Sequence, residues 1–260
     1  MSNQPTLTLF TINMSHYSEK IRWLLDHEKL NYQEEALTPF IHSLPMLIKG
    51  GRKRTTVPVL QLDKEYIQDS PRIVAWLSKE YGPLSSLPED LQDEILDIQQ
   101  RFDAIGKPVA RFLYYSGFAH PALIKDIWTQ FAKPWENAVV RMSYPMIKGL
   151  FTSKMRVNAE GAAKAEQKID QEIKWLEQRL SDGRQFLVGD RLTVADITAA
   201  SLLAPLACPD EHPIYGRKDF REKIAGSASK WAGSPALEWV KKMYSQQRGQ
   251  IWIKSPRSGH

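Results

Sequence analysis

The chain has 260 residues, of which 42% are hydrophobic and 25% are charged, and its formal net charge is +5. These values are ordinary for a globular protein, and the length favours two packed domains over a single core. No apolar run approaches the roughly 20 residues of a membrane-spanning helix, so we expect no membrane span. The single cysteine, Cys208, excludes an internal disulfide and a CxxC redox pair.

The first residues of the chain are polar and lack the basic-then-apolar pattern of a signal peptide, so we expect a cytoplasmic protein. Residues 213–260 are basic, with ten Lys/Arg against three Asp/Glu. No motif typical of nucleic-acid binding accompanies this charge. We interpret the region as a solvated face, or as one that attracts anionic substrates, and expect no nucleic-acid partner.

The first 82 residues alternate between strand and helix patterns. Strand-forming residues that alternate with polar ones mark the strands, and apolar stripes with helical spacing mark the helices. The predicted strands are 6–12, 32–37, 57–62 and 65–68, the predicted helices are 17–28 and 70–81, and residues 39–54 are irregular in pattern. The predicted order of this part is β-α-β-α-β-β-α, in which the second helix can only fall in the irregular stretch, and it is closed by Gly82-Pro83.

The rest of the chain is helical in pattern after a Pro- and Ser-rich linker at residues 83–88. The predicted helices are 89–116, 121–147, 158–181, 193–206 and 234–247. At the start of one of them, Thr193 and Asp196 have the spacing of a capping box. We therefore predict an α+β protein with a small α/β domain at 1–82, the linker, and an all-helical domain at 89–260.

Three short motifs lie where predicted elements begin. Ser15 stands immediately before the first helix, where its hydroxyl and the helix N–H groups can point at one ligand atom. Pro58 cannot donate to a sheet ladder, so it is predicted at a strand's first residue or in a turn, where a cis bond is tolerated. Asp69-Ser70 begins the next helix, whose N–H groups can bind a carboxylate.

These motifs resemble those of the glutathione S-transferase family. The residues that carry the resemblance are Ser15-His16-Tyr17-Ser18-Glu19-Lys20-Ile21-Arg22, Val57-Pro58, Asp69-Ser70, and Val188-Gly189-Asp190-Arg191-Leu192-Thr193-Val194-Ala195-Asp196. The resemblance is to serine-type members and covers most of the chain. It implies a thioredoxin-like N-terminal domain, an all-helical C-terminal domain, glutathione as co-substrate without a metal, and a homodimer. The helical part is longer than the family leads us to expect, which predicts an insertion near 115–160 or a C-terminal extension.

The resemblance also implies which residues bind glutathione. Ser15 is the expected catalytic residue and stabilises the thiolate, although a serine in this place can also be a simple helix cap. Val57 and Pro58 form the expected cis-proline loop, in which Val57 bonds the cysteinyl amide. Asp69 and Ser70 are expected to bind the ammonium and the carboxylate of the γ-glutamyl end.

Two parts of the expected site are less closely specified. The chain has Thr55-Thr56 where the family has Gly-Lys or Gly-Gln, so the partner of the glycyl carboxylate is open, and the candidates are His42, Lys53 and Arg54. The acceptor-substrate site is expected between the domains, with His16 lining it and with Phe112 and Tyr115 from the aromatic cluster at 112–118. The same aromatic residues could also be ordinary core or dimer packing.

The function that follows is glutathione-dependent transfer to, or cleavage of, a small hydrophobic electrophile. Tyr17 and Ser18 are the alternatives to Ser15 as the thiolate donor. A non-catalytic binding or assembly module with the same fold is the alternative from another class, and a glutathione-dependent isomerase is a third. Reduction is disfavoured because no cysteine occupies the expected catalytic position.

Overall fold

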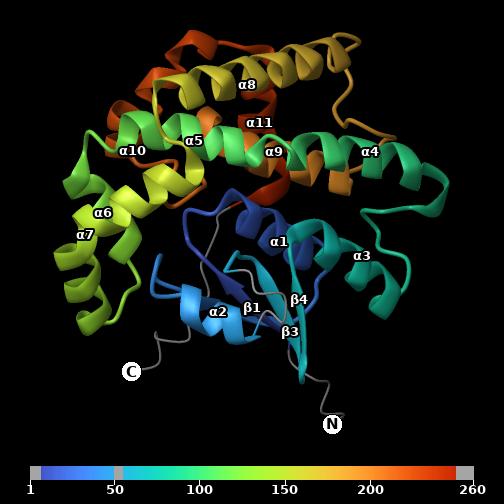
Figure 1. Cartoon of the computed structure of the whole chain (residues 1–260). Helices are drawn as coiled ribbons and strands as arrows, with labels where there is room; N and C mark the ends of the chain where they lie inside the picture. The colour runs from blue at the N-terminus through green and yellow to red at the C-terminus, as the bar shows by residue number, and fades with distance from the viewer. Residues whose placement is uncertain (1–6, 50–54, 250–260) are drawn as a thin grey trace.

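The computed structural model describes residues 7–49 and 55–249. Figure 1 shows two layers, a sheet with its helices and a bundle of helices stacked on it. Helices α1 (His16–His27) and α3 (Ser70–Tyr81) lie between the sheet and the bundle, and α2 (Ser43–Lys49) lies on the other side of the sheet. The predicted order of a mixed α/β part followed by a helical part is confirmed.

The sheet has four strands in the order β2-β1-β3-β4. Their bounds are Leu7–Thr11 for β1, Tyr32–Ala36 for β2, Val59–Leu62 for β3 and Glu65–Gln68 for β4. Strands β1 and β2 are parallel, whereas β3 is antiparallel to both β1 and β4. Side chains alternate across β1, because Leu9 joins the large core that faces the bundle and Phe10 packs with Met46 of α2 and Val59.

The segment that was irregular in pattern contains the short helix α2. Its weak signal has a physical cause, since it is seven residues long, includes Pro45, and buries only Met46. Leu44 and Ile48 are 67% and 75% exposed, so the helix has no apolar face turned fully inward. Such a helix is stabilised by contacts with neighbouring segments more than by an amphipathic pattern of its own.

The bundle contains more helices than the sequence pattern separates. Its α-helices are α4 (Gln92–Asp103), α5 (Gly106–Gly117), α6 (Pro121–Thr129), α7 (Pro134–Met155), α8 (Ala159–Arg179), α9 (Val194–Ala207), α10 (Lys218–Lys223) and α11 (Pro235–Met243). Short 3₁₀ segments at Glu89–Leu91 and Ala225–Trp231 and a π turn, η3, at Tyr244–Arg248 complete the described part.

Two predicted helices are each divided in the structure. The first breaks between α4 and α5, where a side chain on Gly106 would collide with the ring of Tyr17 and with Leu202. The second breaks before Pro134, the first residue of α7, where Glu136 accepts a hydrogen bond from the backbone of Lys133 (2.8 Å).

Helix α9 is the centre of the bundle, and all its residues are buried. It packs against α1, α4, α5 and α11. The predicted capping box at its start is present, and Asp196 accepts hydrogen bonds from the backbone N–H (2.8 Å) and the hydroxyl (2.7 Å) of Thr193 and from the N–H of Leu187 (2.7 Å). Because α1 packs on α9, the helix that begins at Ser15 rests directly on the bundle.

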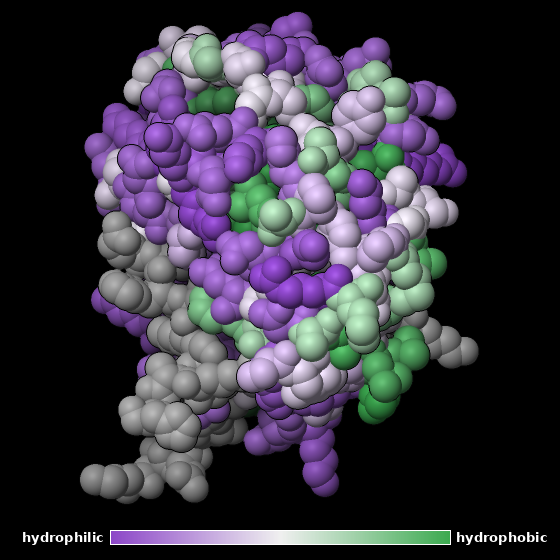
Figure 2. All heavy atoms as spheres, turned by 90° about the vertical axis from the view of Figure 1, so that its left-hand side faces the viewer, coloured by the Kyte–Doolittle hydropathy of each residue, from purple (hydrophilic) through white to green (hydrophobic). Residues whose placement is uncertain are grey.

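The surface is mixed in character. Figure 2 shows a mostly hydrophilic face in which hydrophobic residues gather towards the lower right. The exposed large hydrophobic residues include Leu44, Leu47 and Ile48 on α2 and Trp135, Met142, Met146 and Leu150 on α7. Within residues 7–49 and 55–249, no helix is long and apolar enough to cross a membrane, and no cluster of His, Cys, Asp and Glu could hold a metal ion.

Candidate active site

Three strand ends meet at one edge of the sheet. Phe10 near the end of β1 pairs with Val59 at the start of β3, and Val59 pairs with Gln68 at the end of β4. The segments that continue from these ends therefore come to the same edge. They carry the three predicted motifs, which contain Ser15, Pro58 and Ser70.

Ser15 is the half-buried N-cap of α1. Its Oγ accepts a hydrogen bond from the N–H of Ser18 (3.2 Å), and its carbonyl accepts one from Glu19 (2.9 Å). The proton of the Ser15 hydroxyl has no acceptor among the residues that the structure describes. The N–H groups of His16 and Tyr17 likewise form no hydrogen bond within the described chain. This helix start therefore presents a hydroxyl and two amide donors together.

The Val57–Pro58 peptide bond is cis, as the motif predicted. The loop is held from both sides, because Gln68 donates to the carbonyl of Thr56 (2.7 Å) and the N–H of Asp69 donates to the carbonyl of Pro58 (3.3 Å). Neither the N–H nor the carbonyl of Val57 is hydrogen-bonded within the described residues. A fixed loop with one free donor and one free acceptor can pair with an extended peptide.

Asp69 and Ser70 form the start of α3. Asp69 has a positive φ of 79°, and its Oδ1 accepts a hydrogen bond from the hydroxyl of Thr56 (3.3 Å). Ser70 is only 2% exposed, yet its Oγ and its N–H lack a partner in the described part of the chain. A buried hydroxyl without a partner is unusual, because the desolvation of a polar group is costly. Together with the helix start, it can receive an anion.

His42 lies against the proline loop. Its Nε2 is 2.9 Å from the carbonyl of Thr55, to which it donates a hydrogen bond. Burial lowers the pKa of His42, and the positive charge of Lys154 adds to this effect. The ring is therefore neutral near pH 7 and holds the loop in place. The other two candidates for the glycyl carboxylate, Lys53 and Arg54, lie outside the described residues.

His16 is turned towards the bundle. It is 7% exposed, and its Nε2 donates to the carbonyl of Gly106 at the start of α5 (3.0 Å). Burial lowers its pKa to about 4, although the hydrogen bond to Gly106 opposes the shift. The ring is thus neutral near pH 7, and its described contact is with the other domain.

The aromatic residues of α5 face three different directions. Phe112 is buried and packs on Trp231, with ring centres 5.4 Å apart, and Tyr115 is 50% exposed. Tyr114 is the residue that reaches the Ser15 turn, because its hydroxyl donates to the sulfur of Met14 (3.2 Å). Neighbouring residues of a helix point about 100° apart, so Phe112 and Tyr115, the expected substrate-binding residues, point in other directions than Tyr114, which contacts the Ser15 turn.

Tyr114 belongs to an aromatic cluster beside the turn. Ring centres in this cluster are 4.6 to 6.3 Å apart, and the hydroxyl of Tyr114 accepts a hydrogen bond from Trp128 (3.1 Å). The members are Tyr114, Phe118, Trp128, Tyr144 and Phe151, from α5, α6 and α7. Two surface hollows of about 270 and 340 Å³ lie elsewhere, and no residue of the cluster or of the sheet edge lines them.

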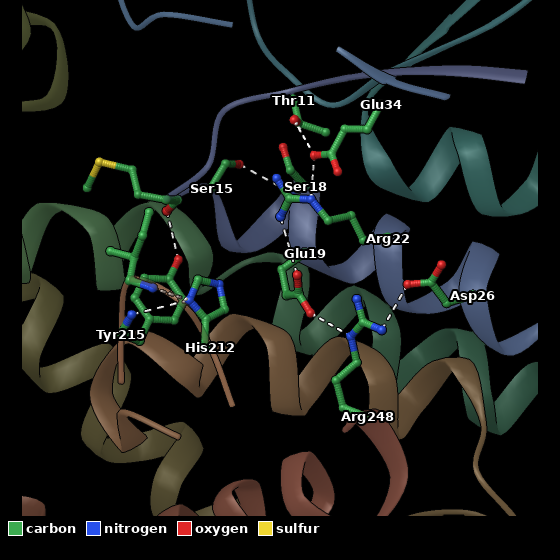
Figure 3. Close-up of polar contacts among 12 residues, drawn as sticks. Thr11, Ser15, Ser18, Glu19, Arg22, Asp26, Glu34, His212, Tyr215 and Arg248 are labelled. Atoms are coloured by element: carbon green, nitrogen blue, oxygen red, sulfur yellow. Dashed lines mark hydrogen bonds and ion pairs between the residues drawn. The ribbon is translucent and has the colours of Figure 1, made fainter. Parts of the chain in front are cut away.

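Behind the sheet edge, a chain of buried charges joins the two domains (Figure 3). Arg22 of α1 pairs with Glu34 (2.6 Å) and Glu19 (3.3 Å), and Glu19 pairs with Arg248 (2.8 Å), which also pairs with Asp26 (2.9 Å). Burial alone would lower the pKa of Arg22, but the carboxylates of Glu34 and Glu19 outweigh it and raise that pKa. We therefore assign Arg22 to the framework, because its described partners are the carboxylates of Glu19 and Glu34.

The fold is similar to those of several solved glutathione S-transferases. One from Methylobacillus flagellatus KT with GSH bound has a TM-score of 0.62 and 14% identity, over 93% of this chain and 96% of that chain. One from Ceriporiopsis subvermispora in complex with glutathione has a TM-score of 0.61 and 14% identity, over 95% and 98%. The beta-etherase LigF from Sphingobium sp. strain SYK-6 has a TM-score of 0.58 and 21% identity, over 91% and 99%. At these identities the likeness shows the fold.

The family follows from the sequence matches. No curated protein matches the chain. The model of the glutathione S-transferase N-terminal domain matches residues 9–85, and that of the C-terminal domain matches residues 159–227. The stretch between them, 86–158, contains α6 and α7, near the predicted insertion. Because the two models together cover more than half of the 260 residues, in the order of the two structural parts, the chain belongs to the glutathione S-transferase family.

Proposed function

We propose that the protein is a serine-type glutathione transferase that adds the glutathione thiolate to a small apolar electrophile, or cleaves such a compound with it. The observation that carries the proposal is the convergence of unpaired polar groups at one sheet edge. These are the hydroxyl proton of Ser15, the backbone of Val57, and the N–H and hydroxyl of Ser70, none of them paired within the described residues. Buried polar groups are normally satisfied, so their convergence favours a polar ligand.

Ser15 is the proposed catalytic residue. Because Ser18 supplies the hydrogen bond that its oxygen accepts, the hydroxyl proton is free to donate to a sulfur. A free thiol has a pKa of about 8.5, and a hydroxyl donor at a helix N-terminus favours the thiolate. The thiolate then attacks the electrophilic carbon, and the leaving group departs with the electron pair of the bond that breaks.

The rest of the tripeptide fits the other two motifs. Val57 would exchange backbone hydrogen bonds with the cysteinyl residue, and the cis bond to Pro58 holds it in place for this. Ser70 would donate its N–H and hydroxyl to the γ-glutamyl carboxylate, where the start of α3 adds a favourable dipole. Asp69, next to it, would accept from the ammonium group.

For the glycyl end we propose Lys53 or Arg54, because a carboxylate needs a cation and His42 is neutral and already bonded to Thr55. His42 would act on this end through the position of the loop. The acceptor substrate would lie beside Met14 and Tyr114, the member of the aromatic cluster that is hydrogen-bonded to Met14 (3.2 Å). His16 would contribute to that wall without acting as a base.

The test is a pH titration of the protein with glutathione, followed by the ultraviolet absorbance of the thiolate, together with retention on immobilised glutathione. We expect retention and a thiolate band that titrates below the ordinary thiol pKa of about 8.5. Absence of both would overturn the proposal and favour a non-catalytic module. A panel of haloaromatic, epoxide, isothiocyanate, peroxide and aryl-ether compounds then identifies the electrophile, and isomerisation without net conjugation would indicate the isomerase alternative.

We also propose a homodimer, in keeping with the family. Light scattering at micromolar concentration checks it, and a monomer under those conditions contradicts it.

A further inference from the structure

The peptide unit between Met14 and Ser15 is held at both of its polar atoms. Its carbonyl oxygen, on Met14, accepts a hydrogen bond from the hydroxyl of Tyr215 (2.7 Å). Its N–H, on Ser15, donates to the carbonyl of Ile12 (2.9 Å). Because a peptide unit is planar, two such bonds fix the plane that ends at the Ser15 Cα. The bond from the N–H of Glu19 to the Ser15 carbonyl (2.9 Å) restrains the next plane, and the two planes together set the direction in which the Ser15 side chain leaves the backbone.

Tyr215 comes from the other domain, 201 residues away along the chain. It lies in the segment between α9 and α10, is 1% exposed, and points at the Met14 carbonyl (Figure 3). The other hydrogen bond of this peptide unit, from the N–H of Ser15 to the carbonyl of Ile12, lies within the turn. The bundle therefore supplies one of the two bonds that fix this plane, next to the residue that we propose as the thiolate donor.

The segment that carries Tyr215 is itself tightly built. The Tyr215 ring stacks on His212 with ring centres 3.8 Å apart and planes 15° apart, and Nδ1 of His212 accepts the backbone N–H of Tyr215 (3.2 Å). A Cβ on Gly216 would come within 2.7 to 3.0 Å of the carbonyl oxygens of Asp210, His212 and Pro209. The Tyr215 hydroxyl is thus presented from a closed turn, with little freedom to swing away.

The hydroxyl is also a constant donor. Burial raises the pKa of Tyr215 well above its ordinary value, and the nearby Glu19 adds to the increase. Burial lowers the pKa of His212 well below 6.5, so the ring that supports Tyr215 is neutral. The hydrogen bond to Met14 therefore stays intact across the pH range in which a glutathione thiol ionises.

We propose that Tyr215 is a positioning residue that sets the angle of the Ser15 hydroxyl towards the glutathione sulfur. The proposal rests on the proposed function, in which Ser15 stabilises the thiolate. Under this proposal a residue of the second domain affects the ionisation of glutathione through one hydrogen bond to the backbone of Met14. A tyrosine that only packs at the interface would affect stability and leave the ionisation of bound glutathione unchanged.

The test uses Tyr215→Phe in the full chain, with Tyr244→Phe as the matched control. Tyr244 is also fully buried between the domains, packs on Trp23, and forms no described bond to the Met14–Ser15 turn. Three quantities are measured: the pKa of bound glutathione by thiolate absorbance, the KM for glutathione, and kcat with a haloaromatic electrophile. A fourth, the exchange rate of the Ser15 amide hydrogen, requires no ligand.

We expect Tyr215→Phe to raise the pKa of bound glutathione and to lower kcat by roughly fivefold, the effect of one ordinary hydrogen bond. The KM for glutathione should change less than about twofold, because the groups at Val57 and Ser70 are untouched. The Ser15 amide should exchange faster. Tyr244→Phe should change none of these quantities.

An unchanged thiol pKa and an unchanged Ser15 exchange rate in Tyr215→Phe would overturn the proposal. The titration is made at saturating glutathione and at a temperature at which both variants are folded by circular dichroism, because unfolded protein would release glutathione and move the observed midpoint towards the free thiol pKa of about 8.5. If wild type shows no thiolate band, the proposed function fails. In that case an increase in Ser15 exchange that exceeds the increase at the other amides of α1 still supports the restraint on the turn, and an equal or absent increase refutes it.

Discussion

The sheet edge and the charged chain behind it contain buried polar groups of opposite kinds. At the edge, neither the hydroxyl of Ser70, which is buried, nor the backbone of Val57 has a hydrogen-bond partner among the described residues. In the charged chain, Glu19, Arg22 and Glu34 are at most 1% exposed, and each has an oppositely charged partner, although Nη2 of Arg22 and Oε2 of Glu34 form no hydrogen bond among the described residues. Both regions involve α1, because Ser15 caps its start and Glu19 and Arg22 belong to it.

The difference teaches how to tell a binding site from a framework. A polar group that is buried without a partner destabilises the free protein, and it is retained where a ligand supplies the missing partner. Buried charges that are paired have no such need, and removing one partner leaves the other unpaired. Four substitutions test this contrast. For each, we predict whether the stability of the protein or its reaction with glutathione should change.

The largest effect is expected from Arg22→Met. The change leaves Glu34 and Glu19 buried with fewer partners, so we expect the free energy of unfolding to fall by about 3–5 kcal/mol. Urea denaturation measures this fall. Lys164→Met, which removes an exposed pair with Glu160, is the control and should cause no measurable loss. Equal stability of the two variants would contradict a framework role for the charged chain.

Ser15→Ala should lower kcat by roughly 10²–10³, the usual cost of losing one preorganised donor. The affinity for glutathione should be largely kept, because the contacts at Val57 and Ser70 remain. Loss of the cap should also lower the stability by about 1 kcal/mol. Steady-state kinetics and glutathione binding measure the separation.

Ser18→Ala and Tyr17→Phe are the controls for that experiment. Ser18 supports Ser15 through its backbone N–H (3.2 Å), which an alanine retains, and the Tyr17 hydroxyl donates to the carbonyl of Asp103 (2.7 Å), so both should keep their turnover. Wild-type turnover in Ser15→Ala together with its loss in either control would show that the thiolate donor is another residue.

His16→Gln should change the dependence of stability on pH. Burial lowers the pKa of His16 from 6.5 to about 4, so the unfolded chain takes up a proton that the folded chain refuses. Stability is therefore lost as the pH falls from 6.5 to about 4, by at most ~3 kcal/mol from this residue. A glutamine keeps a donor for Gly106 and does not titrate, so the variant should lose less stability over this range. Denaturation at pH 8 is the internal control, where the two proteins should be similar, and equal acid sensitivity would contradict the expectation.

Ser70→Ala should have the smallest effect of the four, and it should separate glutathione binding from stability. Glutathione binding should weaken by about 1–3 kcal/mol, because a charge-assisted hydrogen bond is lost. The free protein should be equally stable or slightly more stable, since the hydroxyl has no described partner to lose. Calorimetric binding and thermal unfolding check the two halves, and a clear loss of stability without a loss of binding would make Ser70 part of the framework.

Local signals predicted much of the site. The strand ends, the N-cap at Ser15, the cis bond before Pro58 and the helix start at Ser70 are all features of a few neighbouring residues. Turn and cap preferences act over such short distances, so the sequence predicts them well. The weak helix α2 is the exception, because it buries one residue and has almost no apolar pattern.

The direction of the aromatic side chains of α5 could not be predicted from neighbouring residues. Phe112, Tyr114 and Tyr115 are all apolar aromatic residues of one helix, and the sequence does not say which of them faces the Ser15 turn. The packing of α5 between α8 and α9 decides it, and Tyr114 is the one that contacts Met14. The break before Gly106 contributes, because it sets the rotation at which α5 begins.

The sequence by itself determined the family, the order of strands and helices, and the places where the chain offers free donors. Only the tertiary structure decided which side chains, distant in the sequence, bond to the residues at these positions and next to them. Tyr215 reaches Met14 across 201 residues, and Arg248 reaches Glu19 across 229. Such contacts leave no local pattern, because they arise when two separately formed domains pack and each buried polar group must find its partner in the other.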